Sequence, residues 1–496
     1  MQSLTHALLF LFSLISFTNC FPTNLTLLGH DDLGGLAVRG VQYPSTAADR
    51  QVKEVVDALA HSAGSKISGS AQALKAVEDQ LKKGLQGRNG KKKIEVFFII
   101  YGGSNGDVPL LSSVLQGMLD RPDIFDVKHS LVLGDSYRDF FPQALRTRFA
   151  DDNTEWASKT NPPRREQAIA MFLAKMSSIL SGWNPDLIVA SHFIPPGATT
   201  PEQKKQIRTL TAPSKTRLIV QLQVYYLPGL PSTSLTLKDI KPNSIRMYGQ
   251  QPEIWDKSSA KDVGAAMVGK LPRLSSTAST AKPPRTGEVY AWIDKQKQAR
   301  RQIFYMGMGM KERAFDKRRA FPAFMDLAKE ELATLSDWSY IILHNVQRSE
   351  SDFYRTSHSG RVFHLFVGET SWATLFPEMG VVLTHGGVGS VTDAIAAGVP
   401  QIILPTDYAA DQEYFAKRLE KMQIGVGLPK IPYGALSKPQ ATSVKEIRAA
   451  FAKIKTDRKH YVDGIKPFRK DLANTKAVDN AFEIITRMCA GLVARD

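Results

Sequence analysis

The chain has 496 residues, a hydrophobic content of 43% and a formal net charge of +16. This length predicts at least two domains, and the hydrophobic content is typical of a globular protein. The positive charge would suit a phosphorylated ligand, an anionic membrane surface or nucleic acid. Because no nucleic-acid-binding motif is present, we expect no nucleic acid partner and a solvated basic surface. A peripheral contact with an anionic membrane remains an alternative.

Cysteine and metal chemistry are not indicated by the residue types. The two cysteines, Cys20 and Cys489, cannot form a framework of disulfide bonds. No cluster of Cys and His has the spacing of a metal site. Cys489 falls on the apolar side of a predicted C-terminal helix, so we expect it to be a core residue.

Residues 1–20 are hydrophobic and resemble a secretory signal peptide. They lack the basic start and the small-residue cleavage site that such signals usually carry. Asn24 begins a glycosylation sequon just beyond them, which is consistent with a secreted glycoprotein. We therefore expect entry into the secretory pathway, with a cytoplasmic or membrane-associated location as the alternative. No later run is long and apolar enough to predict a transmembrane span.

Residues 21–93 form a leader that is expected to contain two amphipathic helices. Val52 and Leu59 follow helical spacing in the first, and Leu74 and Leu81 do so in the second. Four interpretations are open for this leader. It is a propeptide, an arm that binds a partner, a flap on the next domain, or a poorly ordered extension.

Residues 94–270 are expected to form a first α/β domain. The apolar run 94–101 predicts a buried strand, a glycine-rich loop follows over 102–109, and a helix is expected over 110–119. This order is typical of a Rossmann-like unit, but the Gly-x-Gly-x-x-Gly fingerprint is absent, so NAD is not indicated. Further buried strands are predicted over residues 127–133, 184–191 and 218–224.

A second α/β domain is expected over residues 288–470, after a linker over 271–287 that is rich in Ser, Thr, Ala and Pro. Its first strand is predicted over 302–306. Gly307 and Gly309 follow directly, and glycines at the end of a strand admit a close approach of ligand to backbone.

The segment after residue 380 carries the clearest chemical signal. A short apolar strand ends at His385, and Ser390 is expected to cap a helix over 391–397. The turn between them contains Gly386, Gly387 and Gly389. A strand, a glycine-rich turn and a helix N-terminus form an anion site, because free N–H groups and the helix dipole point at one spot. The side chain of His385 adds a further donor.

This segment resembles the donor-binding signature of nucleotide-sugar glycosyltransferases of the GT-B fold, in the group of sterol, macrolide and UDP-glucuronosyl or glucosyl transferases. The shared features are the His-Gly-Gly-x-Gly-Ser turn, an acidic Asp393, the Gly-Val-Pro over 398–400 and the pair Asp411-Gln412. The loop over 102–109 is similar to the first loop of sterol and macrolide glycosyltransferases, although Asn105 replaces an Arg and a Gln is missing.

The resemblance implies an α/β protein with two facing Rossmann-like domains, parallel sheets and a cleft between them. A last helix over 471–496 would pack back on the first domain. The residues implied to bind the nucleotide sugar are Gly307, Gly309, Trp372, His385, Gly386, Gly387, Gly389, Ser390, Asp393, Asp411 and Gln412. Asp411 and Gln412 would contact sugar hydroxyls, but they lie farther beyond Pro405 than in relatives, which leaves the sugar open.

Catalysis with inversion requires a base for the acceptor hydroxyl and stabilisation of the departing diphosphate. The resemblance assigns the second role to His385 and offers Asp107 for the first, with a helix-capping role for Asp107 as the alternative. Ser104, Asn105 and His192 are the acceptor-side candidates. No Asp-x-Asp pair occurs, so neither a metal nor another cofactor is expected.

The resemblance therefore implies an inverting, metal-independent glycosyltransferase. The expected donor is a UDP-sugar, and the expected acceptor is a hydroxyl of a small lipid, sterol or secondary metabolite, with a polyol also open. Three alternatives keep the same fold. One is a binding protein that retains a nucleotide-sugar or glycan pocket without catalysis, and the others are a nucleotide-sugar epimerase and a lipid-linked sugar transferase.

Overall fold

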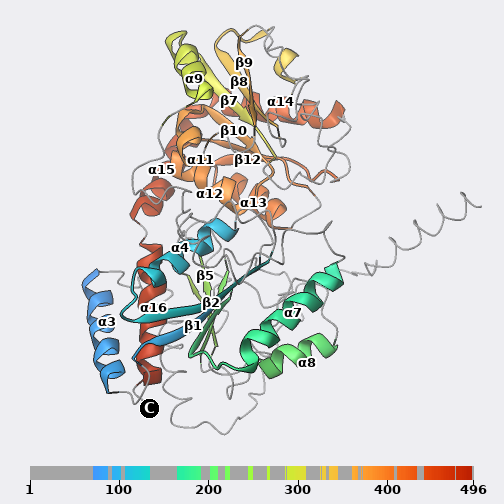
Figure 1. The fold of residues 1–496 in the computed structure, drawn as a ribbon. Coiled ribbons are helices and arrows are strands. Elements are labelled where there is room, and N and C mark those ends of the chain that lie inside the picture. Colours follow the sequence, from blue (N-terminus) through green and yellow to red (C-terminus); the bar gives the residue numbers. More distant parts are fainter. Residues whose placement is uncertain are drawn as a thin grey trace, which may run out of the picture. The chain divides into compact units, whose positions relative to one another are not determined.

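The computed structural model describes residues 71–87, 92–101, 107–133, 165–190, 201–210, 218–223, 244–249, 265–267, 285, 287–308, 324, 327–330, 334–344, 360–366, 370, 372–406, 410–432, 441–474 and 476–493. Within them, the strands form two six-stranded sheets, and every paired neighbour is parallel. Parallel neighbours need crossover connections, and helices lie in several of these connections among the described residues (Figure 1). The expected α/β class with two parallel sheets is confirmed.

The first sheet has the strand order β2-β1-β3-β4-β5-β6. Its strands are β1 (Ile94–Tyr101), β2 (Phe125–Leu133), β3 (Leu187–Ala190), β4 (Leu218–Gln223), β5 (Ser244–Tyr248) and β6 (Ala265–Met267). Its helices are α4 (Asp107–Leu119), α7 (Arg165–Ser181) and α8 (Pro201–Leu210). The sequence did not predict β5, β6 or α8, and β5 and β6 extend the sheet to six strands.

Alternate residues of β1 enter separate cores on the two faces of the first sheet. Val96 and Phe98 pack with the cluster that contains Leu115 of α4. Phe97 and Ile99 pack with the cluster that includes residues of α7. A strand covered on both faces reads as a continuous apolar run, which explains why the sequence signal here is strong.

The second sheet has the strand order β12-β11-β10-β7-β8-β9. Its strands are β7 (Gln302–Met306), β8 (Trp338–His344), β9 (Val362–Phe366), β10 (Val381–Thr384), β11 (Gln401–Ile403) and β12 (Gly425–Gly427). Counted along this domain the order is 6-5-4-1-2-3, which is the dinucleotide-fold order 3-2-1-4-5-6 read from the other edge. The first and fourth strands, β7 and β10, therefore lie side by side at the centre.

Helices cover both faces of the second sheet. The helices are α9 (Glu288–Gln298), α11 (Trp372–Leu375), the 3-10 helix η5 (Phe376–Glu378), α12 (Val388–Ala397), α13 (Ala410–Lys421), α14 (Ala441–Thr456) and α15 (Arg458–Asn474). Phe304 of β7 stacks on Phe451 of α14 with ring centroids 4.5 Å apart. Ile303 and Tyr305 of the same strand pack with α9 and η5 on the opposite face.

Helix α3 (Ala71–Gln86), in the leader, lies beside the last helix, α16 (Ala477–Val493) (Figure 1). Its apolar face of Leu74, Val77, Leu81 and Leu85 is buried, as its helical spacing predicts. The first predicted leader helix lies outside the described residues, as do Cys20 and the expected signal peptide. Cys489 in α16 is fully buried, which confirms its place in the core.

Helix α16 also packs on the first sheet, through α4 and β4. The guanidinium of Arg121, in the turn after α4, joins these elements. Its Nε donates to Glu78 of α3 at 2.6 Å, and its Nη1 donates to the carbonyl of Gly117 at 2.9 Å. Its Cζ lies 4.3 Å from the ring centre of Phe482 in α16. The side chain of Arg121 therefore contacts the leader helix α3, helix α4 and the last helix α16.

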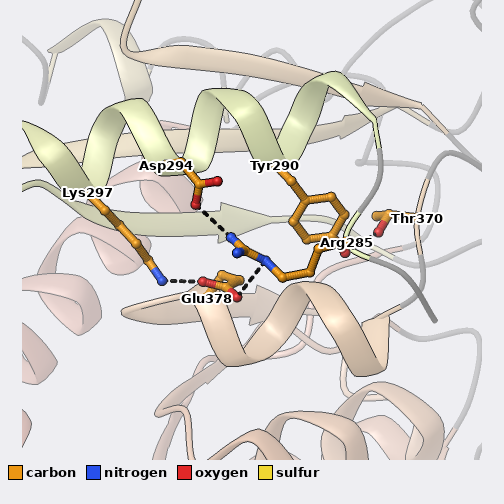
Figure 2. A network of polar contacts seen from close by, with 6 residues as sticks. All are labelled: Arg285, Tyr290, Asp294, Lys297, Thr370 and Glu378. Atoms are coloured by element: carbon orange, nitrogen blue, oxygen red, sulfur yellow. Dashed lines mark hydrogen bonds and ion pairs between the residues drawn. The ribbon is translucent and has the colours of Figure 1, made fainter. Parts of the chain in front are cut away.

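An ion network attaches the segment before α9 to η5 (Figure 2). Arg285 pairs with Asp294 at 2.7 Å and with Glu378 at 3.2 Å, and Lys297 also pairs with Glu378. The hydroxyl of Tyr290 hydrogen-bonds to Thr370 at 2.7 Å. These contacts hold Arg285 and helix α9 against η5 and Thr370.

Among the described residues, no helix has the length and apolar character that crossing a bilayer requires.

Candidate functional site

The candidate site begins where β7 and β10 end, at the point where the strand order of the second sheet reverses. Open α/β sheets bind ligands at the carboxyl ends of the strands at such a point, because the chains leave the two strands in opposite directions. The N–H of Gly307, just after β7, donates to the carbonyl of Leu383 in β10 at 3.0 Å. Gly307 and His385 therefore leave the sheet next to each other.

The turn after β10 can be formed only with glycine at its centre. Gly386 has a φ of +87°, which L side chains rarely adopt. A Cβ at Gly386 would lie 2.6 Å from Cγ2 of Ile403 and 3.2 Å from the carbonyl oxygen of Gln412. A Cβ at Gly387 would lie 2.5 Å from Nε2 of His385, so the imidazole rests directly against this backbone. The turn is pressed between its own histidine and the start of α13.

Helix α12 presents free backbone N–H groups beside this turn. Its N-cap is Gly387, with φ −63° and ψ 141°, and the first intrahelical bond runs from the N–H of Val391 to the carbonyl of Gly387 at 3.0 Å. The N–H groups of Val388, Gly389 and Ser390 precede that bond and have no partner within the helix. Together with the helix dipole they can hold an anion such as a phosphate.

The expected cap at Ser390 is wrong. The helix begins at Val388, about one turn earlier than predicted, and its N-cap is Gly387. Ser390 therefore lies inside the first turn of the helix and not at its cap. The reason is that Val388 and Val391 are buried, so the helix continues toward the strand until the glycine turn ends it. The N–H groups of the turn are thereby brought closer to the end of β10.

Asp411 and Gln412 lie in the first turn of α13. Both are buried, at 7% and 5% exposure. The side-chain oxygen of Gln412 accepts hydrogen bonds from the backbone N–H and the hydroxyl of Thr406, each at 2.8 Å. Gln412 also lies against the glycine turn, because a Cβ at Gly386 would lie 3.2 Å from its carbonyl oxygen. The contact with Thr406 was not predicted from the sequence.

The other donor-side candidates are less closely grouped. Asp393 is in the second turn of α12 and 5% exposed. Trp372 begins α11, where its ring stacks on Phe376 at 5.6 Å and meets the edge of Tyr305 at 5.5 Å. Gly309 lies outside the described residues.

On the first sheet, β1 and β3 are neighbours in the order 2-1-3-4-5-6, so this sheet also reverses beside its first strand. Asp107 is the first residue of α4, three residues before the predicted start. Pro109 is accepted there because a proline is tolerated in the first turn of a helix. The acceptor-side candidates Ser104, Asn105 and His192 lie outside the described residues.

A buried histidine pair next to the candidate site was missed by the sequence reasoning. His344 ends β8, the strand adjacent to β7, and its Nε2 lies 2.8 Å from Nδ1 of His364 in β9. Burial, with a smaller contribution from the charge of His364, lowers the pKa of His344 to about 3, so His344 is neutral at physiological pH. The available signal was a histidine at the end of an apolar run, as at His385.

In the part of the chain that the structure describes, no cluster of His, Cys, Asp and Glu could hold a metal ion.

The comparisons with known proteins point to one group of enzymes. The family model described as the glycosyltransferase family 28 C-terminal domain matches residues 319–453. The sterol 3-beta-glucosyltransferase of Saccharomyces cerevisiae is 26% identical over 246 residues, which are 48% of this chain and 19% of that protein. The vancomycin aglycone glucosyltransferase of Amycolatopsis orientalis is 38% identical over 80 residues, 16% of this chain and 19% of that protein. The matches thus span about a fifth of each of these curated relatives.

The solved structures agree on the architecture. A UDP-glucosyltransferase from Polygonum tinctorium, capable of glucosylating indoxyl, superposes with a TM-score of 0.53 at 12% identity, covering 80% of this chain and 99% of that one. At this sequence identity the structural similarity indicates the fold alone. The chain therefore has the GT-B glycosyltransferase fold, and strands β8 to β12 of its C-terminal sheet lie in the region that matches the family 28 C-terminal domain.

Proposed function

We propose that this protein is an inverting, metal-independent glycosyltransferase that moves a sugar from a UDP-sugar to a hydroxyl of a small lipid, sterol or secondary metabolite. The observation that carries the proposal is the anion site at the strand-order reversal of the second sheet. There the turn at Gly386 and the first N–H groups of α12 meet beside His385. The sterol 3-beta-glucosyltransferase and the vancomycin aglycone glucosyltransferase that resemble the chain support the acceptor class.

The departing nucleoside diphosphate gains charge as the bond to the anomeric carbon breaks. Preorganised donors aimed at that charge stabilise the transition state more than the ground state, and this difference lowers the barrier. The N–H groups of Val388, Gly389 and Ser390 are fixed by the helix, and His385 is held against Gly387. In this proposal these groups take the role that a metal ion has in other transferases, and Asp393, Asp411 and Gln412 bind the ribose and the sugar.

The acceptor side requires a base, and the proposal assigns this role to Asp107 at the start of α4. A carboxylate that removes the hydroxyl proton as the bond to the anomeric carbon forms would contribute about 10²- to 10⁴-fold to the rate. Helix capping is the competing role for Asp107, and it makes a different prediction. A cap affects the free energy of unfolding, whereas a base affects kcat with donor binding unchanged.

The first experiment is a thermal-denaturation screen of the purified protein with UDP-, GDP- and TDP-sugars in the presence of EDTA. Binding to the native state raises the melting temperature by mass action. We expect a rise with UDP and UDP-sugars, and we expect His385→Ala to weaken this binding roughly ten- to hundredfold, because a hydrogen bond to a charged group contributes about 1.5–3 kcal/mol. His460→Ala is the matched control, because His460 is exposed on α15.

Transfer is then measured with the donor that binds. Asp107→Asn is expected to lower kcat with an unchanged donor dissociation constant. If no nucleotide raises the melting temperature, or if the rise requires a divalent cation, the proposal of a metal-independent transferase is wrong. If the donor binds but neither hydrolysis nor transfer is detected over an acceptor panel, the non-catalytic alternative is favoured.

A further inference from the structure

We infer that Thr406 is a positioning residue that fixes the Gln412 amide as a pure hydrogen-bond donor toward the transferred sugar. The inference rests on the proposed function and deepens it, because it names the chemistry that the site accepts at one sugar position. The observation is a pair of hydrogen bonds from Thr406 to one atom of Gln412, both within the buried part of the site.

The orientation of the Gln412 amide follows from the partner on the main chain. The backbone N–H of Thr406 lies 2.8 Å from the side-chain oxygen of Gln412, and an N–H group can only donate. The atom that faces it must therefore be the carbonyl oxygen and not the amide nitrogen. The hydroxyl of Thr406 donates to the same oxygen at 2.8 Å. Both lone pairs of that oxygen thus accept hydrogen bonds from Thr406, and the NH₂ group of the Gln412 amide points away from Thr406.

Thr406 is itself held by the second sheet. The N–H of Leu404 donates to the carbonyl of Thr384 at 2.9 Å, and Ile431 donates to the carbonyl of Pro405 at 2.9 Å. Thr406 forms an isolated parallel bridge with Ile431. It is 3% exposed. The two donors that hold the amide are therefore fixed by backbone contacts.

Gln412 is in turn fixed to the anion-binding turn. A Cβ at Gly386 would lie 3.2 Å from the carbonyl oxygen and 3.4 Å from the Cα of Gln412, so these backbones touch. The Gln412 amide consequently has a set position relative to the N–H groups of α12. A diphosphate bound at those N–H groups would place its attached sugar within reach of a donor whose direction is already determined.

The chemical consequence concerns the kind of oxygen that the site accepts. A glutamine that is free to rotate can offer a sugar hydroxyl either its oxygen or its nitrogen. Here the oxygen is occupied, so the contact must be made to an acceptor lone pair. A sugar with a hydroxyl or a carboxylate oxygen at this position would satisfy the amide. A deoxy sugar would leave a buried N–H without a partner, which is unfavourable.

The test compares Thr406→Val with Thr406→Ser in the full chain. Valine keeps the branched shape and the backbone N–H but removes the hydroxyl donor, whereas serine keeps both donors. Dissociation constants for UDP and for UDP-glucose are measured by calorimetry. We expect Thr406→Val to weaken UDP-glucose binding about three- to tenfold, the effect of one hydrogen bond, and to leave UDP binding unchanged. Thr406→Ser is expected to restore UDP-glucose binding.

The outcomes separate this inference from the proposed function. If the wild-type protein binds neither UDP nor UDP-glucose, the proposed function fails. If it binds them and Thr406→Val changes both or neither, the positioning role of the Thr406 hydroxyl is overturned. If serine does not restore binding, the hydroxyl is not the group responsible, and the role is again overturned.

A wild-type measurement covers the case in which Thr406→Val does not fold. UDP-glucose is compared with its deoxy and deoxyfluoro analogues at each sugar position. Fluorine can weakly accept a hydrogen bond but cannot donate one. We expect one position at which the fluoro sugar binds more tightly than the deoxy sugar. Equal binding of the two analogues at every position would overturn the inference.

Discussion

The two sheets have similar strands but differ in what fixes their candidate residues. In the C-terminal sheet, β7, β10 and β11 lead directly to Gly307, Gly386 and Thr406, and neighbouring atoms determine the place of each. In the N-terminal sheet, of the candidates only Asp107 is among the described residues, where it begins α4. The donor side can thus be argued from packing, whereas the acceptor side depends on the resemblance of one loop.

Truncation of a buried phenylalanine that packs on each sheet is expected to have the largest effect on stability. Phe482→Ala removes a fully buried ring that packs on Phe125 of the N-terminal sheet, and Phe451→Ala removes the ring stacked on Phe304 of the C-terminal sheet. Each is expected to lower the free energy of unfolding by about 3–5 kcal/mol. Only Phe451→Ala is expected to weaken UDP binding, because Phe304 lies in the strand that leads to Gly307.

Chemical denaturation and UDP calorimetry at a temperature below unfolding would measure these two quantities. Phe482 and Phe451 serve as controls for each other, since the residue type and the burial are matched. Equal losses of UDP affinity in the two variants would show that the sheets do not contribute separately, and the contrast between donor and acceptor sides would fail.

Gly386→Ala is expected to have the next largest effect. It combines a left-handed backbone, which costs roughly 1–2 kcal/mol for a residue with a Cβ, with a contact of 2.6 Å to Ile403. Overpacking adds about 1–3 kcal/mol. Because any relief of the contact moves the turn, UDP binding should be lost as well as stability. Thermal denaturation with and without UDP measures both effects.

Two glycines allow the causes to be separated. Gly360 has a φ of +68° with open space around a Cβ, so Gly360→Ala reports backbone strain alone. Gly182 has open space and no left-handed φ, so Gly182→Ala reports neither cause. We expect the order Gly386, Gly360, Gly182 for the loss of stability, and a loss of UDP binding only at Gly386. A Gly386→Ala protein that binds UDP normally would contradict the proposed role of the turn.

The same contrast explains which features the sequence could predict. The strand and glycine turn at His385 were predictable because burial on both faces and a required left-handed residue leave direct marks in the sequence. Strands β5 and β6 left no such mark, since β5 mixes Ser244 and Arg246 with apolar residues and β6 has three residues. The bond between Thr406 and Gln412 joins a strand end to a different helix, so it required the fold to be known.

The buried pair His344–His364 offers the smallest effect, and it too belongs to the C-terminal sheet alone. The pKa of His344 is lowered from 6.5 to about 3, chiefly by burial. Below pH 6.5, His344 therefore binds a proton in the unfolded chain but not in the folded protein. The free energy of unfolding consequently decreases as pH falls. Each unit of pH below that value costs about 1.4 kcal/mol, which gives about 2 kcal/mol at pH 5.

His344→Gln tests this cause, because its amide can still hydrogen-bond to His364 but does not titrate. The loss of unfolding free energy between pH 7 and pH 5 should be about 2 kcal/mol smaller in this variant than in the wild type. His460→Gln, on exposed α15, should leave that difference unchanged. Hydrogen exchange can locate the effect, since acid should lower the protection factors of β8 before those of β1. An earlier loss of protection in β1 would place the acid-sensitive group in the N-terminal sheet and remove His344 as its cause.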